Sequence, residues 1–311
     1  MNSFFDHIIE KQGAVILDGA LATELEKRGA NLNHALWSAK LLIENPALIK
    51  QVHLDYLHAG ADIITTATYQ ASFSGFAKEG YSKKETEDLM QLSLSIAKEA
   101  IDEFLKTVPS ANRQAPLVAA SIGPYGAALA DGSEYRGDYN VTIETLIEFH
   151  KDRLDLLAKS NADILAFETI PCLEEALAIK ELLKKYPKRQ AWVSFSCKDE
   201  AHLSSGALFA EAIELLNESP NIIGFGVNCT APEYIESLIK IALPITNKFI
   251  IVYPNKGELY NSLSKTWEPS NKCPLSFLEN AKIWKAAGAK IIGGCCRTSP
   301  ADINELKNSL R

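Results

Sequence analysis

Three cysteines stand where apolar segments of the sequence end, and their type and spacing could support metal chemistry. Cys295 and Cys296 follow two glycines in Gly293-Gly294-Cys295-Cys296, directly after the apolar run 289–292. Cys229 ends a second apolar run, 222–229. Three thiolates suit a soft tetrahedral ion such as zinc and leave its fourth position open for a substrate. An open position makes the three cysteines candidates for a catalytic metal site.

Other interpretations of these cysteines are weaker. Buried, inert thiols are common, but two adjacent thiols beside glycines that permit close backbone approach favour a ligand role. A redox dithiol usually has the spacing Cys-x-x-Cys, which is absent. Adjacent cysteines rarely bridge each other because the geometry strains the peptide. The scattered Cys172, Cys197 and Cys273 are predicted to be small apolar fillers, and histidine ligands are not expected because none of the six histidines stands at a predicted strand end.

Composition excludes several classes of protein. The chain has 311 residues, 47% of them hydrophobic and 23% charged, with a formal net charge of −7. This acidic balance argues against a nucleic-acid partner, which needs clustered Lys and Arg. No apolar run approaches the roughly 18–20 residues that span a membrane. The N-terminal residues lack the features of a signal peptide. We therefore expect a cytoplasmic protein with no membrane partner.

Eight short apolar runs bounded by turn residues predict eight strands. Most are continuously apolar rather than alternating, as is typical of parallel strands covered on both faces. The predicted strands are Ala14–Ala20, Ala61–Tyr69, Pro116–Ile122, Ala162–Ile170, Ala191–Cys197, Ile222–Cys229, Phe249–Asn255 and Lys290–Cys296.

Helical patterns separate these strands. Gly60 and Gly288 stand where helices end, and Pro232 and Pro300 where helices begin. Alternating strands and helices predict one α/β domain over 1–311, a (β/α)8 TIM barrel. An open doubly wound sheet lacks support because no Gly-x-Gly-x-x-Gly turn follows the first strand. The predicted helices are Glu85–Leu105, Ile143–Ser160, Leu173–Lys185, Ala210–Asn217, Pro232–Ile241, Leu275–Ala287 and Pro300–Leu310.

The barrel would bring the polar residues that end its strands to one mouth, because active sites in this fold lie at the carboxyl ends of the strands. Besides the cysteines, these residues include Asp18, Tyr69, Glu168, Asn228 and Asn255.

Glu168 ends an apolar strand, and its desolvation is costly unless the carboxylate is paired. It is a candidate to bind a substrate ammonium, with helix capping or a structural ion pair as the alternatives. Asp18 could equally cap the first helix, and the backbone N–H groups at Gly19 could bind a carboxylate.

A long, turn-rich and aromatic segment, Gly123–Tyr139, follows the third predicted strand. Loops of this length in a compact barrel are often lids, and an ordered surface loop is the alternative. Its tyrosine faces would attract a cationic donor.

The chain resembles the homocysteine S-methyltransferases through six motifs in order. These are Asp18-Gly19-Ala20-Leu21-Ala22-Thr23, the segment 60–70, the loop Gly123–Tyr139, Phe167-Glu168-Thr169-Ile170-Pro171, Gly226-Val227-Asn228-Cys229-Thr230 and Gly293-Gly294-Cys295-Cys296. The resemblance implies a zinc-bearing barrel with Cys229, Cys295 and Cys296 as ligands and the homocysteine sulfur as the fourth.

The same resemblance implies roles for the other residues. Glu168 would hold the amino group of the substrate and the Asp18–Gly19 backbone its carboxylate, with Tyr69 and Asn228 as further substrate-binding candidates. Thr169 stands where betaine-dependent relatives carry a tyrosine that can ligate resting zinc, so water or Asn228 could complete the resting site.

The methyl donor is the point on which the subfamilies differ. Because the chain has about 15 residues after Cys296, it resembles the stand-alone type, which transfers methyl from S-methylmethionine or S-adenosylmethionine to L-homocysteine and forms L-methionine. A betaine-dependent enzyme and a non-catalytic zinc- or thiol-binding barrel are the alternatives. The sequence leaves the oligomeric state and the acceptance of selenium analogues open.

Overall fold

The computed structural model describes residues 4–34, 36–108, 114–261, 266–268 and 274–311. Its centre is an eight-stranded parallel sheet in the order β1-β10-β7-β6-β5-β4-β3-β2. The strands are β1 (Val15–Ile16), β2 (Ile63–Thr65), β3 (Leu117–Ile122), β4 (Ile164–Ile170), β5 (Ala191–Phe195), β6 (Ile222–Asn228), β7 (Phe249–Tyr253) and β10 (Ile291–Ile292).

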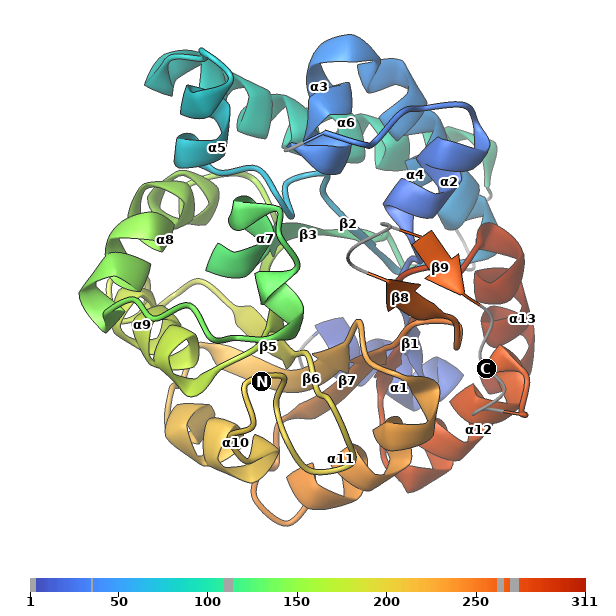
Figure 1. Cartoon of the computed structure of the whole chain (residues 1–311). Helices are drawn as coiled ribbons and strands as arrows, with labels where there is room; N and C mark the ends of the chain where they lie inside the picture. Colours follow the sequence, from blue (N-terminus) through green and yellow to red (C-terminus); the bar gives the residue numbers. More distant parts are fainter. Residues whose placement is uncertain (1–3, 35, 109–113, 262–265, 269–273) are drawn as a thin grey trace.

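The two edges of this sheet meet and close it into a barrel (Figure 1). Leu17, just after β1, forms a parallel bridge with Ile63 of β2. The backbone N–H of Asp18 donates to the carbonyl oxygen of Ile63 at 3.0 Å, and that of Asp62 donates to the carbonyl oxygen of Ile16 at 2.7 Å. The predicted (β/α)8 barrel is therefore confirmed. The first, second and last strands are shorter than predicted, because the chain leaves the regular ladder to build the loops at the barrel mouth.

Helices surround the barrel (Figure 1), and each predicted helix is present within a few residues of its expected bounds. Gly60 and Gly288 end α4 and α12 with positive φ angles of 118° and 126°, and Pro300 begins α13. The helices are α1 (Phe4–Gln12), α2 (Leu21–Lys27), α3 (Leu41–Glu44), α4 (Pro46–Ala59), α5 (Phe73–Lys78), α6 (Lys83–Thr107), α7 (Tyr125–Leu129), α8 (Ile143–Ala158), α9 (Leu173–Leu183), α10 (Phe209–Asn217), α11 (Ile235–Ala242), α12 (Phe277–Ala287) and α13 (Pro300–Leu310), with 3-10 turns η1 (Trp37–Lys40), η2 (Ser133–Tyr135) and η3 (Pro232–Tyr234).

Two hydrophobic cores hold the barrel together. The larger one lies between the strands and the ring of helices. The smaller one fills the barrel interior, where Val15, Ile63, Ala166, Trp192 and Ile291 from different strands pack together. Side chains thus fill the barrel below its mouth, and the polar groups at the carboxyl ends of the strands lie above a closed apolar floor.

The segment Gly123–Tyr139 is more regular than the loop expected from the sequence. It contains α7 and η2, and the carbonyl oxygen of Glu134 in η2 accepts a hydrogen bond from Ser196 Oγ at 3.1 Å. Between β7 and α12 the chain adds an antiparallel hairpin, β8 (Leu259–Asn261) with β9 (Thr266–Glu268).

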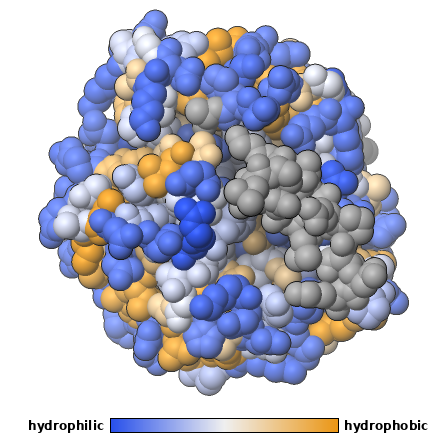
Figure 2. Space-filling model, in the orientation of Figure 1, coloured by the Kyte–Doolittle hydropathy of each residue, from blue (hydrophilic) through white to orange (hydrophobic). Residues whose placement is uncertain are grey.

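Figure 2 shows that hydrophilic side chains predominate on the face of the molecule that is also seen in Figure 1. Among the described residues, no helix is both long and apolar enough to cross a membrane.

Candidate functional site

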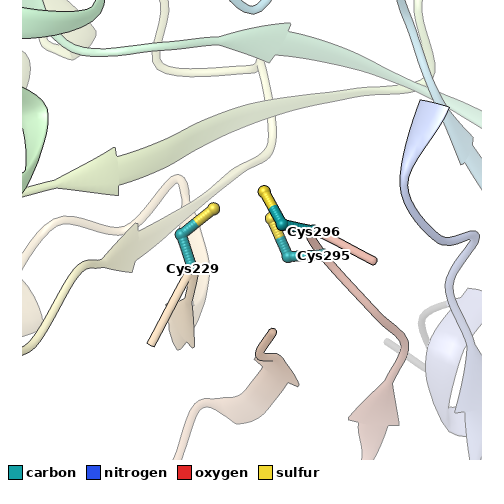
Figure 3. A group of neighbouring side chains, drawn as sticks. All are labelled: Cys229, Cys295 and Cys296. Carbon is teal, nitrogen blue, oxygen red and sulfur yellow. The ribbon is translucent and has the colours of Figure 1, made fainter. Parts of the chain in front are cut away.

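The structure brings the three predicted cysteines together. The Sγ atoms of Cys229, Cys295 and Cys296 all lie within 4.8 Å of one another. Cys229 follows β6, whereas Cys295 and Cys296 follow β10, and the sulfur of Cys229 points across to the other two (Figure 3). Cys229 and Cys295, which are 66 positions apart in sequence, therefore belong to one cluster of thiols at the barrel mouth.

Gly293 and Gly294 allow the backbone before the paired cysteines to pass close to its neighbours. A Cβ atom on Gly293 would lie 2.4 Å from the Cβ of Leu17, and one on Gly294 would lie 2.3 Å from Thr298 Oγ1. The N–H of Gly294 donates to the carbonyl oxygen of Asp18 at 3.1 Å, and that of Cys295 donates to that of Pro254 at 2.9 Å. These contacts fix both cysteines relative to the ends of β1 and β7.

Cys229 and Thr169 both have left-handed backbone conformations, with φ angles of 49° and 61°. Such conformations are unusual for residues with a side chain and often occur at functional sites. The register between β4 and β5 shifts between Phe167 and Ile170, so Glu168 and Thr169 lie in a strand irregularity that redirects their side chains. The carboxyl ends of β4 and β6 thus depart from regular strand geometry where the candidate residues lie.

The side chain of Asn228 links these two irregular strand ends. Its Oδ1 accepts a hydrogen bond from the N–H of Thr169 at 2.7 Å, and its Nδ2 donates to Thr169 Oγ1 at 2.8 Å. Asn228 and Thr169 are both buried. The amide thereby positions Thr169, and the expected roles of Asn228 in substrate contact and as resting metal ligand stay predictions.

Contacts among the three thiols, together with burial, raise the pKa of Cys229, Cys295 and Cys296 well above the usual value. A cation is therefore needed to make this cluster anionic at neutral pH. Cys172 and Cys197 are buried away from the cluster, as predicted for apolar fillers. Cys273 lies outside the described residues.

Glu168 of β4 is a buried carboxyl group whose hydrogen-bond partners are neutral. Its Oε1 accepts a short hydrogen bond from Ser121 Oγ, and Tyr253 is its other hydrogen-bonding partner. Burial raises the pKa of Glu168 to about 7, and these two hydrogen bonds only partly oppose the rise. No ion pair forms with Glu168 among the described residues, so the structural ion pair considered from the sequence is absent there. The carboxylate can still accept a cation.

Asp18 does not cap the first helix after β1, contrary to one of the two sequence interpretations. The N-cap of α2 is Ala20, whose N–H donates to Thr298 Oγ1 at 3.2 Å. The carboxylate of Asp18 instead accepts hydrogen bonds from the N–H of Thr65 at 2.7 Å and from Thr65 Oγ1. Burial raises the pKa of Asp18 to about 8, so this group is largely uncharged at neutral pH. The N–H of Gly19 has no acceptor among the described residues.

Tyr69 lies in the turn after β2 rather than at the end of a long strand. Its ring packs edge-to-face on Trp37, with 5.9 Å between the ring centroids. Burial raises the pKa of Tyr69 well above the usual value, and the nearby groups that affect it include Glu134, Cys229 and Thr169. The phenol therefore lies in the same neighbourhood as the cysteine cluster.

Sequence reasoning missed a buried polar network that holds the loops around the site. Arg153 Nη2 donates to the carbonyl oxygen of Gly123 at 2.6 Å and contacts His150 Nδ1 at 3.0 Å. Arg153 Nη1 donates to the carbonyl oxygen of Ala71 at 3.1 Å. His150 Nε2 in turn lies 2.7 Å from Glu175 Oε1. The only sequence signal was the presence of charged residues on the otherwise apolar faces of α8 and α9.

His53 in α4 is a second unexpected buried group. It is 1% exposed, and neither ring nitrogen has a hydrogen-bond partner among the described residues. Burial lowers its pKa to about 4. No histidine joins the cysteine cluster in the described part of the chain.

Comparisons with known proteins agree on one family. The family model described as homocysteine S-methyltransferase matches residues 15–310. A homocysteine S-methyltransferase of Bacillus subtilis (strain 168), YbgG, is 52% identical over 301 residues, covering 96% of this chain and 95% of the relative. A selenocysteine Se-methyltransferase of Brassica oleracea var. italica is 45% identical and covers 97% of this chain and 90% of the relative. The crystal structure of the homocysteine methyltransferase MmuM from Escherichia coli in its metallated form superposes with a TM-score of 0.87 at 43% identity, covering 97% of this chain and 98% of MmuM.

Proposed function

The chain belongs to the homocysteine S-methyltransferase family, and we propose that it is a zinc-dependent enzyme of this kind. It transfers a methyl group from a sulfonium donor, S-methylmethionine or S-adenosylmethionine, to the sulfur of L-homocysteine. The C–S bond of the sulfonium breaks, a new C–S bond forms on homocysteine, and the thiol proton is released. The products are L-methionine and a neutral thioether. The observation that carries the proposal is the cluster of three Sγ atoms within 4.8 Å at the barrel mouth.

The three cysteines fit a zinc ion. A tetrahedral site with Zn–S bonds of about 2.3 Å has sulfur atoms about 3.8 Å apart, which is compatible with the observed spacing. Cys229, Cys295 and Cys296 would hold the ion, and three protein ligands leave one position for a substrate. When bound, zinc would remove the proton from the homocysteine thiol at neutral pH and keep the sulfur nucleophilic. The E. coli relative, which was crystallised in a metallated form, supports a metal in this family.

Glu168 and the backbone at Asp18–Gly19 would position homocysteine from its two charged ends. A substrate ammonium beside Glu168 would stabilise its buried carboxylate, which has no ion pair within the described residues. The N–H of Gly19, which has no acceptor among the described residues, could bind the substrate carboxylate. Asp18 would not repel that carboxylate strongly, because burial raises the Asp18 pKa to about 8. Tyr69 would close the site on the side of β2.

Holding the acceptor sulfur and the methyl carbon in line is the main contribution that these residues can make. A sulfonium leaves as a neutral thioether and needs no proton from the protein. The site accordingly needs no general acid. Glu168 serves in binding, and its neighbours Ser121 and Tyr253 fix its position.

A donor panel tests the proposal. The purified, zinc-loaded protein is incubated with L-homocysteine and either S-methylmethionine, S-adenosylmethionine or betaine, and methionine is quantified. We expect methionine from a sulfonium donor and little from betaine. Preferential use of betaine would support the betaine-dependent alternative. The absence of methionine with all three donors would contradict the proposal.

A non-catalytic zinc- or thiol-binding barrel is distinguished by metal spectroscopy. In a catalytic site, added homocysteine should contribute a fourth sulfur to the first shell of zinc, which X-ray absorption can count. A closed site should not change. The panel should also include L-selenocysteine as acceptor, because the similar Brassica enzyme is named a selenocysteine Se-methyltransferase.

A further inference from the structure

Glu134 lies in the segment that follows β3, and its half-buried side chain forms no ion pair with a described residue. It lies in η2, and its Oε2 is buried and accepts no hydrogen bond among the described residues. An unpaired buried carboxylate is costly because burial disfavours the charged form. Burial raises the pKa of Glu134 to about 7, although the N–H of the same residue partly opposes the rise. This carboxylate is therefore not explained by a contribution to stability.

The nearest cation on the segment, Arg136, lowers the pKa of Glu134 through its charge but forms no ion pair with it. The guanidinium of Arg136 is directed to other groups: its Nε lies 3.3 Å from Asp138 Oδ1, and its Nη2 lies 3.1 Å from Ser133 Oγ. Its Nη1 donates to the carbonyl oxygen of Asp131 at 3.2 Å. Within the described part of the chain, no ion pair forms with Glu134. The charge of this carboxylate is therefore not matched by an ion pair within the described residues.

The backbone around Glu134 is fixed at the mouth of the barrel. Its carbonyl oxygen accepts the hydrogen bond from Ser196, the residue after β5. The backbone of Glu134 also packs closely on α7. A Cβ atom on Gly126 would lie 2.5 Å from the N atom of Glu134. The position of Glu134 is thus set by contacts on both sides, without help from its own side chain.

Aromatic rings and the cysteine cluster share this neighbourhood. Glu134 is the charged group with the largest effect on the phenol of Tyr69, which is also affected by Cys229 and Cys295. The phenol of Tyr135 is affected by Cys229, Cys296 and Glu134. A carboxylate with tyrosine rings close by is suited to a soft organic cation, through charge attraction and cation–π contact.

We propose that Glu134 binds the positive charge of the sulfonium methyl donor, beside Tyr69 and Tyr135 and opposite the acceptor sulfur. This inference rests on the proposed function for the identity of the cation. Because the donor loses its charge on transfer, the carboxylate stabilises the bound donor more than the transition state. Glu134 therefore contributes to donor affinity rather than to the rate of the chemical step, and it releases the neutral thioether readily.

Steady-state kinetics of Glu134→Gln test the role. We expect the KM of the sulfonium donor to rise at least tenfold, while kcat does not fall and the KM of homocysteine changes less than twofold. Asp138→Asn is the matched control, since it removes a carboxylate from the same segment that is exposed and paired with Arg136. The control should leave both KM values unchanged. An equal rise in both KM values, a fall in kcat alone or unchanged kinetics would overturn the proposal.

Two further measurements keep the result independent of turnover. Calorimetric titration with trimethylsulfonium, a cation without an amino-acid part, should show binding to the wild type that is weakened at least tenfold in Glu134→Gln. This titration tests the role of Glu134 even if the wild type transfers no methyl group to homocysteine. The absence of methyl transfer would contradict only the proposed function. Thermal unfolding at pH 8 should show Glu134→Gln to be at least as stable as the wild type, whereas a structural role predicts a loss. Equal binding of trimethylsulfonium by both proteins, or destabilisation of the variant, would contradict the inference.

Discussion

The amide of Asn228 holds Thr169 by both its backbone N–H and its hydroxyl, at 2.7 and 2.8 Å. These two residues are 59 positions apart, and the contact joins the ends of β4 and β6. Thr169 has a left-handed backbone, as does Cys229, the neighbour of Asn228. One side chain thus joins two strand ends that carry left-handed residues, one beside Glu168 and one at a cysteine of the cluster.

Replacing Asn228 with Ala should destabilise the protein and weaken metal binding. The N–H of Thr169 would be buried without an acceptor, at a cost of roughly 1–3 kcal/mol, and Cys229 would lose the support of its neighbour. Chemical denaturation and zinc titration measure the two effects. Asn31→Ala, at an exposed position, should have neither effect. Unchanged zinc affinity in Asn228→Ala would contradict the positioning role.

Replacing any of Cys229, Cys295 or Cys296 with Ser should remove both bound metal and methyl transfer. A serine hydroxyl is a poor ligand for a soft ion at neutral pH. Metal content per chain and methionine formation are measured on the same preparations. Cys197→Ala, a buried thiol outside the cluster, is the control and should retain both properties. Full activity in a metal-free triple variant would exclude the proposed role of zinc.

Replacing Gly294 with Ala should displace the paired cysteines. The new Cβ would lie 2.3–2.5 Å from three side-chain atoms of Thr298, and overpacking of this kind costs about 1–3 kcal/mol. We expect lower stability and lower zinc affinity, measured by denaturation and metal titration. Gly80→Ala adds a Cβ where no atom lies within 4 Å. Because Gly80 has a φ of 88°, this control should lose stability through backbone strain but keep normal zinc affinity.

Replacing Glu168 with Gln should raise the KM of homocysteine by at least tenfold, which corresponds to about 1.4 kcal/mol. The ammonium of the substrate would lose its charged partner, whereas the donor site would be unaffected. The opposite pattern is expected for Glu134→Gln, so comparing the two variants separates acceptor binding from donor binding. Glu174→Gln, at an exposed position of α9, should change neither KM. A rise in donor KM alone for Glu168→Gln would contradict the assignment.

His53 should make stability depend on pH. Burial lowers its folded-state pKa to about 4, below the usual histidine value of 6.5, so only the unfolded chain takes up this proton as pH falls from 6.5 to 4. The free energy of unfolding should therefore fall by about 3 kcal/mol over that range from this residue alone. Denaturation curves of wild type and His53→Leu at several pH values measure the difference. Replacement of the exposed His58 should not alter the pH dependence, and parallel curves for His53→Leu and wild type would refute the prediction.

The sequence alone predicted the barrel and most of its helices, because continuous apolar runs and helix-ending residues such as Gly60 and Gly288 are local signals. It also selected the three cysteines, since their positions after apolar runs are visible without a structure. It overestimated the first and last strands, where hydrophobicity continues although the hydrogen-bond ladder ends. The contacts of Asn228 with Thr169 and of Arg153 with Gly123 were not predictable, because they join residues that are distant in sequence and carry no periodic signal.

The left-handed turn at Cys229 has a consequence for protein engineering. Designers could install three cysteines at the ends of two strands in another (β/α)8 barrel, and the sequence motif would then be complete. The sulfur atoms would still diverge, because an ordinary strand end would direct the first thiol elsewhere. A transplanted site would also need the asparagine before that cysteine, a threonine for it to hold, and two glycines ahead of the paired cysteines. The unit to transplant is thus three loop backbones with their mutual contacts, rather than three side chains.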